Sequence, residues 1–338
     1  MIVGADPVSV RQYVAAIDAE LGSQSPGTTA LTALIDQAEQ AVSMSSTTRQ
    51  HQHVISETVL RKFLRTVPPA GRVLARVDLV GGQRDLVVPN DVGYVDNFVP
   101  VDSKVTEELW GQVESRLFAA LKAARGDTAL GDPVHLSTLR NVVALHFVRN
   151  PHTLELHNEA FAGALEAQLE RTAMGPWAAE AYQRQYGIVP AGPEGMRRGA
   201  ELFHERVITL HSQGGLFRIS VQNLFEKVCD RFASRGVEIL TPANPGKEFL
   251  LGDVPAITIA LATGQFGLSR GVTVDEADMI FMPLTPRLLV VIGPPSAARS
   301  ISDADVAAFN RMQVREARDY VLHRPGADFA ASIAAWRT

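Results

Sequence analysis

Apolar residues recur at helical spacing over three stretches of the chain. Residues 7–22 and 28–44 predict two amphipathic helices, separated by a polar segment that contains Pro and Gly. Residues 105–125, which include TEELWGQVESRLFAALKAAR, predict the clearest helix of the sequence. From residue 133 to about residue 236 the pattern predicts helix after helix, with breaks at pairs of Pro, Gly and Asn.

Short runs of branched and aromatic residues predict strands in two places. RVLARVDLV and RDLVV flank GGQ at residues 81–83 and predict a hairpin. Beyond residue 236, five such runs predict a sheet, and residues 302–322 predict a last helix. The five runs are 237–242, 247–253, 255–262, 278–284 and 287–293. This order predicts an α+β fold that is mainly helical, with a short N-terminal hairpin and a small C-terminal, mostly antiparallel sheet.

The domain organisation follows from the same pattern. We expect an N-terminal helical pair at residues 1–45, a single mainly helical α+β domain at 46–325, and a C-terminal tail at 326–338. A chain of 338 residues with 46% hydrophobic residues is long enough to bury a core of that size.

Composition limits the classes of function. The net charge of −5 argues against a protein whose whole surface binds nucleic acid, but it permits a local basic patch. A single cysteine, Cys229, excludes an internal disulfide framework and indicates a reducing compartment. Residues 1–30 lack the pattern of a secretory signal, and no apolar stretch reaches the roughly 18 residues of a membrane span. We therefore expect a cytoplasmic protein without a membrane segment.

Two short motifs are weak candidates for a reactive site. GLSRG at residues 267–271 matches the pattern of a nucleophile elbow, but the residues after it predict no helix, so we expect a loop. Glu201 and His204 form one of the two ExxH motifs that a di-iron bundle needs, and the sequence has no second one. We expect His204 and His211 to be solvated or at the edge of the core, and a di-iron oxidase is the weakest alternative.

A basic segment follows His53. Five basic residues and no acidic one lie in this segment: Arg61, Lys62, Arg65, Arg72 and Arg76. One interpretation is a solvated basic face with His53 at the end of a loop. The other is an anion-binding patch with His53 as an acid or base, because histidine changes its charge near neutral pH. The residues alone leave both interpretations open.

Six segments, taken in order, resemble a known family. They are HQHVISETVLRKF, VPNDVGYVDNFVPVDSKVTEELWGQVESRL, LRNVVALHFVRNP, FLLGDVPAI, MIFMPLTPRLLVVIG and FNRMQVREARDYV. Together they resemble the bacterial family filed as domain of unknown function 4238, over about residues 50–322. The first 45 residues are an extra helical pair outside this resemblance.

The resemblance implies a set of polar residues contributed by distant segments. The set is His53, Arg61, Glu114, Arg149, Asp253 and Asn310. Polar residues shared in this way often converge on one site. A buried ion-pair network that holds the helices onto the sheet is the alternative, for example Arg149 with Asp253 or Glu114.

The leading hypothesis is an enzyme, a hydrolase and in its most specific form a nuclease-like one, that acts on a phosphate-bearing or other anionic substrate. His53 would be the general base or acid. Arg61 and Arg149 would clamp the anion, with Asn310 as a further substrate contact. The carboxylates would orient His53 or hold a divalent ion; they are Asp253 and Glu114.

The alternative hypothesis is a non-catalytic interaction or sensing protein. In that case the polar set is structural, and residues 1–45 dock a partner protein or a second copy of the chain. An anionic small molecule or nucleic acid is the expected ligand class under the first hypothesis, and no membrane partner is expected. The sequence identifies neither a cofactor nor a metal.

Overall fold

The computed structural model describes residues 8–22, 29–43, 51–96, 98–99, 104–126 and 128–337. Contacts group the chain into two compact units. Unit 1 comprises residues 1–49, 99–106 and 154–224, and unit 2 comprises residues 50–98, 107–153 and 225–338. The domain boundaries expected at residues 45 and 325 would separate parts that fold independently. They stay a prediction.

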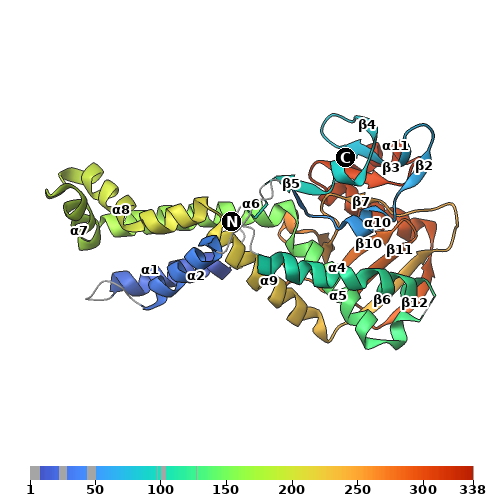
Figure 1. Cartoon of the computed structure of the whole chain (residues 1–338), viewed down its shortest axis with the longest axis horizontal. Coiled ribbons are helices and arrows are strands. Elements are labelled where there is room, and N and C mark those ends of the chain that lie inside the picture. The colour runs from blue at the N-terminus through green and yellow to red at the C-terminus, as the bar shows by residue number, and fades with distance from the viewer. Residues whose placement is uncertain are drawn as a thin grey trace. The chain divides into compact units, whose positions relative to one another are not determined.

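Unit 1 is built from helices (Figure 1). Apolar side chains from five of them form its core, including Tyr13, Leu34, Phe161, Leu210 and Leu216. The two helices expected in the first 45 residues are present, while residues 1–7, 23–28 and 44–45 lie outside the described part. The helices are α1 (Val8–Gly22), α2 (Thr29–Ser43), most of α6 (Pro151–Ala173), α7 (Pro176–Tyr186), α8 (Gly192–Ser212) and the first half of α9 (Gly215–Ala233).

His204 is a structural residue in the core of unit 1. Its Nδ1 atom lies 3.0 Å from the Tyr13 hydroxyl, and its Nε2 atom lies 2.9 Å from the Thr172 hydroxyl. Burial lowers the pKa of His204 to about 4, so the ring is neutral at pH 7. His204 is therefore fully buried, and not solvated or at the edge of the core as expected, and both of its ring nitrogens are used to join α1, α6 and α8.

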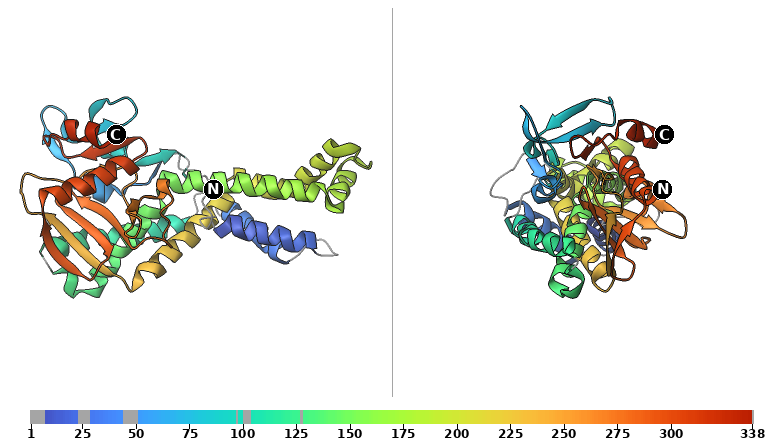
Figure 2. Two further views of the ribbon diagram at one scale, coloured as in Figure 1. Left: turned by 180° about the vertical axis from the view of Figure 1, so that it is seen from behind. Right: turned by 90° about the vertical axis from the view of Figure 1, so that its right-hand side faces the viewer.

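Unit 2 contains a six-stranded sheet in the order β12–β6–β11–β10–β8–β9. All neighbours are antiparallel except β12 and β6, which are parallel, so the expected mostly antiparallel sheet is confirmed. Side chains alternate between its faces: Leu289 and Val291 pack with Val306 of α10, while α5 contacts β6, β10 and β11. Figure 2 shows α10 lying across its face of the sheet.

The elements of this half of unit 2 have the following bounds. They are α4 (Lys104–Arg125), α5 (Pro133–Val148), β6 (Gly236–Pro242), β8 (Ile257–Ala260), β9 (Gln265–Phe266), β10 (Met279–Thr285), β11 (Leu288–Gly293), β12 (Ala297–Ile301) and α10 (Asp303–Glu316). No helix of the described residues is long and apolar enough to cross a membrane.

A second sheet of unit 2 brings together strands from the N-terminal and C-terminal parts of the unit. Strand β3 pairs with β4 across the GGQ turn, so the expected hairpin is confirmed, and β13 then pairs with β3 and β7. Helix α11 (Ala330–Arg337), in the expected C-terminal tail, buries Ile333 against Val77 and Leu250. The remaining elements are β1 (His51–His53), α3 (Glu57–Leu60), β2 (Arg65–Val67), β3 (Gly71–Asp78), β4 (Arg84–Val87), β5 (Tyr94–Asp96), β7 (Leu251–Gly252) and β13 (Tyr320–His323).

Gly93 fixes the backbone around the end of β1. Its φ angle is +73°, in the left-handed region that favours glycine. Its carbonyl accepts hydrogen bonds from the N–H groups of Val54 (2.8 Å) and Ile55 (3.0 Å), and its own N–H donates to the Tyr320 hydroxyl (2.8 Å). A Cβ atom at this position would lie 2.9 Å from Cδ1 of Leu60. Backbone conformation and close packing therefore both require glycine here.

We predict that Gly93→Ala lowers the free energy of unfolding by roughly 2–4 kcal/mol, because left-handed strain adds to overpacking. Gly82→Ala is the matched control: its φ angle is +68°, yet nothing lies within 4 Å of a Cβ atom there. The control should lose only the strain of about 1–2 kcal/mol. Urea unfolding of both variants measures the difference, and equal losses would contradict the packing argument.

Candidate functional site

The turn after His53 is held by a buried histidine that the sequence did not single out, His146. Its Nε2 atom accepts a hydrogen bond from the Ser56 N–H (3.0 Å), and its Nδ1–H donates to the Val142 carbonyl (2.7 Å). These two partners require a neutral ring with the proton on Nδ1. Burial lowers the pKa of His146 to about 4, which agrees with that state at pH 7. The backbone that presents His53 is thus anchored to α5.

His53 lies at the end of β1, half-buried, with its ring edge-on to Tyr94 at 6.4 Å between centroids. Its Nδ1 atom is buried and forms no hydrogen bond of normal geometry with the described residues. Burial, followed by the charge of Arg149, lowers the pKa of His53, while the carboxylates of Glu57 and Glu114 act in the opposite direction. His53 is therefore a neutral imidazole at pH 7 beside one cation and two carboxylates.

The two arginines expected to clamp an anion both have carboxylate partners. Arg149 donates from Nη1 to Glu114 at 2.8 Å, its guanidinium covers the Trp110 ring at 4.5 Å, and its side chain is 7% exposed. Arg61 donates to Glu57 at 2.7 Å on the surface. The structure therefore brings His53, Arg149 and Glu114 together, with Arg61 beside them through Glu57. Two cations and two carboxylates leave this cluster without net charge.

Asp253 supports the backbone rather than joining this cluster. Its two carboxylate oxygens accept hydrogen bonds from the N–H groups of Arg318 and Asp319, each at 2.8 Å. Burial raises the pKa of Asp253 to about 6, against the effect of these bonds. The bonds fix the start of β13, whose Tyr320 hydroxyl accepts from Gly93. Asp253 thus acts on the His53 turn only through the strand that it positions.

Asn310 likewise binds backbone groups and is 1% exposed. Its side-chain oxygen accepts from the Leu250 N–H (2.8 Å), and its amide nitrogen donates to the Glu248 carbonyl (2.9 Å). Gln313, one turn later on α10, binds Gly252 and Pro255 in the same manner. These amides replace the sheet partners that the irregular segment around β7 lacks. The structure therefore gives Asn310 no surface on which to meet a substrate.

No metal site is apparent at the expected carboxylates. Among the side chains that the structure describes, no group of three or more His, Cys, Asp or Glu could hold a metal ion. The GLSRG segment also has a structural role: the Ser269 N–H (2.9 Å) and hydroxyl (2.5 Å) both donate to the buried carboxylate of Glu316. The loop expected there is confirmed as a short 3-10 turn, Leu268–Arg270.

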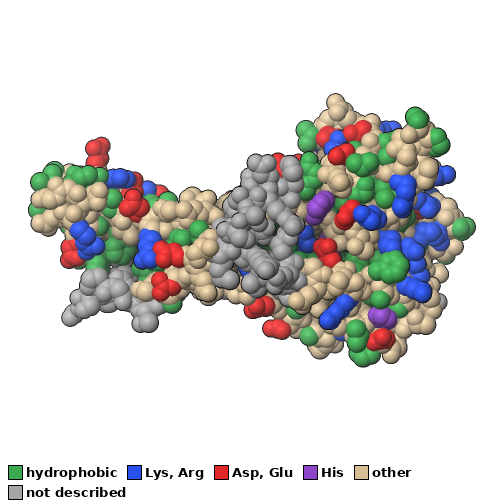
Figure 3. All heavy atoms as spheres, in the orientation of Figure 1, with side chains coloured by type: hydrophobic (Ala, Val, Ile, Leu, Met, Phe, Trp, Pro, Cys, Tyr) green, Lys and Arg blue, Asp and Glu red, His purple; other side chains and the backbone are tan. Residues whose placement is uncertain are grey.

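A basic cleft of about 430 Å³ lies elsewhere in unit 2. Four cationic side chains from four separate segments line it, together with the hydroxyl-bearing Thr241 and Thr285. The four are Lys62, Arg125, Arg287 and Arg324. Figure 3 shows that Lys and Arg side chains gather on the face of unit 2 turned toward the viewer. Of the basic segment that the sequence highlighted, only Lys62 belongs to this cleft.

The charges of the basic cleft are largely uncompensated. Arg324 forms an ion pair with Glu248. Arg287 donates only to backbone carbonyls, among them those of Pro242 (2.9 Å) and Pro245 (2.7 Å). Within the described residues, no carboxylate pairs with Lys62 or Arg125. Burial, and then the charge of Arg125, lowers the pKa of Lys62, so like charges are held close together.

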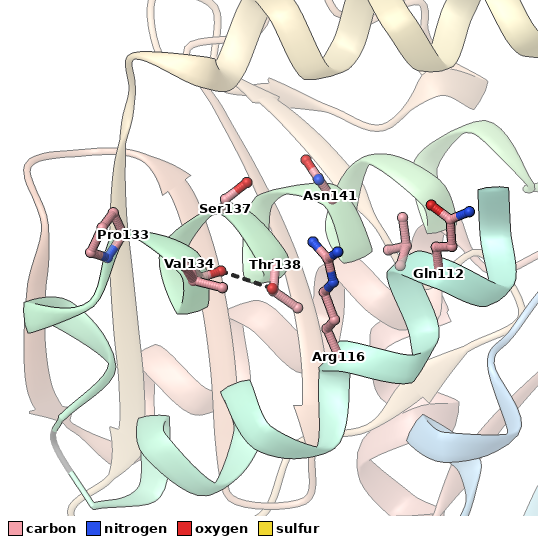
Figure 4. Close-up of a pocket in the computed structure, with 8 residues that line it drawn as sticks. Gln112, Arg116, Pro133, Val134, Ser137, Thr138 and Asn141 are labelled. Carbon is pink, nitrogen blue, oxygen red and sulfur yellow. Dashed lines mark hydrogen bonds between the residues drawn. The ribbon is translucent and has the colours of Figure 1, made fainter.

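A second hollow, of about 360 Å³, lies between α4 and α5 (Figure 4). Its lining mixes polar and apolar side chains and carries one cation, Arg116, whose side chain extends over the groove toward Asn141. The Thr138 hydroxyl is already bound to the Val134 carbonyl at 2.8 Å. This groove offers fewer charged contacts for an anion than the basic cleft.

The folded pKa of His146 predicts a pH dependence of stability. The unfolded pKa is 6.5 and the folded one about 4, so the unfolded chain binds more protons between these values. The contribution of the neutral His146 ring to the free energy of unfolding is fully present above pH 6.5, and it falls by roughly 3 kcal/mol as the pH drops to 4. The variant His146→Gln keeps a hydrogen-bond donor and acceptor but cannot titrate. On the same acidification its free energy of unfolding should therefore fall by that much less than the free energy of unfolding of the wild type. Urea unfolding at both pH values tests this, and identical pH slopes would contradict it.

Comparison with known proteins gives a family but no activity. The family described as "Protein of unknown function (DUF4238)" matches residues 51–327, a range that contains the His53 cluster and all four cations of the basic cleft. No curated protein and no solved structure matches the chain. The match covers most of the sequence and agrees with the resemblance drawn from its six segments. The chain therefore belongs to the family described as "Protein of unknown function (DUF4238)".

Proposed function

We propose that the protein binds a phosphate-bearing ligand in the basic cleft of unit 2. The observation that carries the proposal is the convergence of Lys62, Arg125, Arg287 and Arg324 on one cleft in a chain of net charge −5. With Arg324 neutralised by Glu248, three positive charges remain for a ligand. Phosphate oxygens accept charge-assisted hydrogen bonds from guanidinium and ammonium groups, which are about twice as strong as neutral ones.

The energetics of the basic cleft favour a ligand over a structural role. Like charges held together destabilise the protein unless an anion relieves them, and binding sites commonly carry that cost. Clefts of roughly 300–1,000 Å³ accommodate small organic ligands, and this one lies in that range. The proposed ligand is thus the anionic one expected from the sequence, but the cations proposed to bind it are those of the basic cleft and not Arg61 and Arg149.

The polar set itself fits the network alternative better than the catalytic one. Arg149 and Glu114 pair with each other, and Asp253 and Asn310 bind backbone groups. A docking role for residues 1–45 rests on less, because the apolar sides of α1 and α2 already pack within unit 1. We place the protein in the cytoplasm, consistent with a single cysteine whose pKa burial raises to about 11.

We predict that Lys62→Ala and Arg125→Ala each weaken the binding of inorganic pyrophosphate about tenfold, since each removes one charge-assisted contact. Melting temperature should stay unchanged or rise, because the repulsion between the two cations is relieved. Arg72→Ala is the control, an exposed cation of the same basic segment that does not line the cleft. Calorimetric titration measures binding. Unchanged affinity in both variants, or no binding by the wild type, would overturn the proposal.

Hydrolysis of a phosphate ester at the His53 cluster, apart from the basic cleft, is a second candidate, and the neutral, half-buried imidazole of His53 is the observation that favours it. Such a ring can accept a proton from an attacking water. If His53 is the base, His53→Ala should abolish hydrolysis of a phosphodiester substrate and leave pyrophosphate binding in the cleft intact. A variant that hydrolyses as fast as the wild type would exclude this role for His53.

A further inference from the structure

An aromatic side chain stands exposed beside the basic cleft. Phe118, on α4, is 64% exposed, although most of the apolar residues of this helix are buried. The ammonium group of Lys62 lies 4.8 Å from the centre of its ring, so one ring face meets the cation. Because the residue is still largely exposed, the remainder of the ring is open to solvent. The exposed part of the ring is available to stack against a flat ring of a ligand.

Phe118 belongs to a stripe of α4 that continues to the cleft. Phe118, Lys122 and Arg125 are at positions i, i+4 and i+7, so they lie on one face of the helix. The sequence from Ser115 to Arg125 contains three basic residues and no acidic one. Both Lys62, at the ring, and Arg125, at the end of the stripe, line the basic cleft. The stripe and the cleft thus form one continuous positive surface with an aromatic ring at its edge.

We infer that this surface, Phe118–Lys122–Arg125 together with Lys62, binds single-stranded nucleic acid, with a base stacked on Phe118 and phosphates on the three cations. The inference rests on the proposed phosphate site and names its ligand. Proteins that bind single strands combine a positive track for the backbone with aromatic side chains on which bases stack. Charge complementarity therefore selects a polyanion that also carries flat rings.

The length of the stripe favours a strand over a mononucleotide. Phe118 and Arg125 are separated by about 10 Å along the helix axis, at 1.5 Å per residue. Lys122 lies between them, so positive charge continues along the stripe beside the cleft on which Lys62 and Arg125 converge. A strand can stack one base at Phe118 and place successive phosphates along this line and into the cleft. The chain's net charge of −5 argues against binding over the whole surface and is compatible with binding at one local positive surface.

The test compares a short fluorescein-labelled oligothymidylate with an abasic oligomer of the same length, measured by fluorescence anisotropy on the full chain. The wild type should bind oligothymidylate more tightly than the abasic oligomer. Phe118→Ala should weaken oligothymidylate binding roughly tenfold, the contribution of one stacked base. It should leave binding of the abasic oligomer and of pyrophosphate unchanged. Leu261→Ala, a change at a side chain that is 62% exposed, is the matched control and should bind as the wild type does.

Three results would overturn the inference. They are equal binding of both oligomers by the wild type, unchanged oligothymidylate binding by Phe118→Ala, and an equal loss in Leu261→Ala. Failure of the two proposals can be told apart. Pyrophosphate binding without oligothymidylate binding would overturn the strand and leave the phosphate site standing. Binding of neither probe would overturn both.

Discussion

Buried backbone N–H groups in two irregular segments must find acceptors inside unit 2, and much of the structure depends on how they do so. The turn after His53 gives its N–H groups to the Gly93 carbonyl and to His146. The segment around β7 gives its own to the side-chain oxygens of Asn310 and Gln313. An unsatisfied buried N–H costs about 1–3 kcal/mol. Side chains that meet this need are therefore committed to the scaffold.

This constraint links residues that are far apart in the sequence. Asp253 holds the start of β13, Tyr320 of that strand accepts the N–H of Gly93, and Gly93 accepts the N–H groups that follow His53. The ion pair of Arg149 and Glu114 completes the surroundings of His53 without adding net charge. The positive charge of the basic cleft remains largely uncompensated among the described residues, and for this reason we propose that cleft, and not the His53 cluster, as the site for an anion.

The sequence predicts the fold class better than the site. Helical spacing at residues 105–125 and the branched runs after residue 236 predict elements that the structure contains, because both patterns follow from which faces are buried. The roles of Arg61 and Arg149 could not be predicted, since their carboxylate partners decide whether they are available to a ligand. Asn310 illustrates the same difficulty: a carboxamide binds a substrate or a backbone segment with equal ease.

The basic cleft shows why residues that converge only in space are difficult to identify from the sequence. Its cations come from four separate segments, and the pattern around each one is that of an ordinary exposed residue. The density of basic residues at positions 61–76 favoured an anion-binding site there. In the structure, however, Arg61 pairs with Glu57 and Arg76 pairs with Asp85. Lys62 alone connects the local pattern to the cleft. The exposure of Phe118 could not be predicted for a similar reason, because the other apolar residues of its helix are mostly buried.

The most direct test of the account is a crystal structure of the protein soaked with tungstate, a phosphate analogue whose anomalous scattering marks its position. We predict a tungstate ion in the basic cleft, in contact with Lys62 and Arg125. Tungstate bound instead between His53 and Arg149, with the basic cleft empty, would contradict the claim that the charges of that cluster are already satisfied.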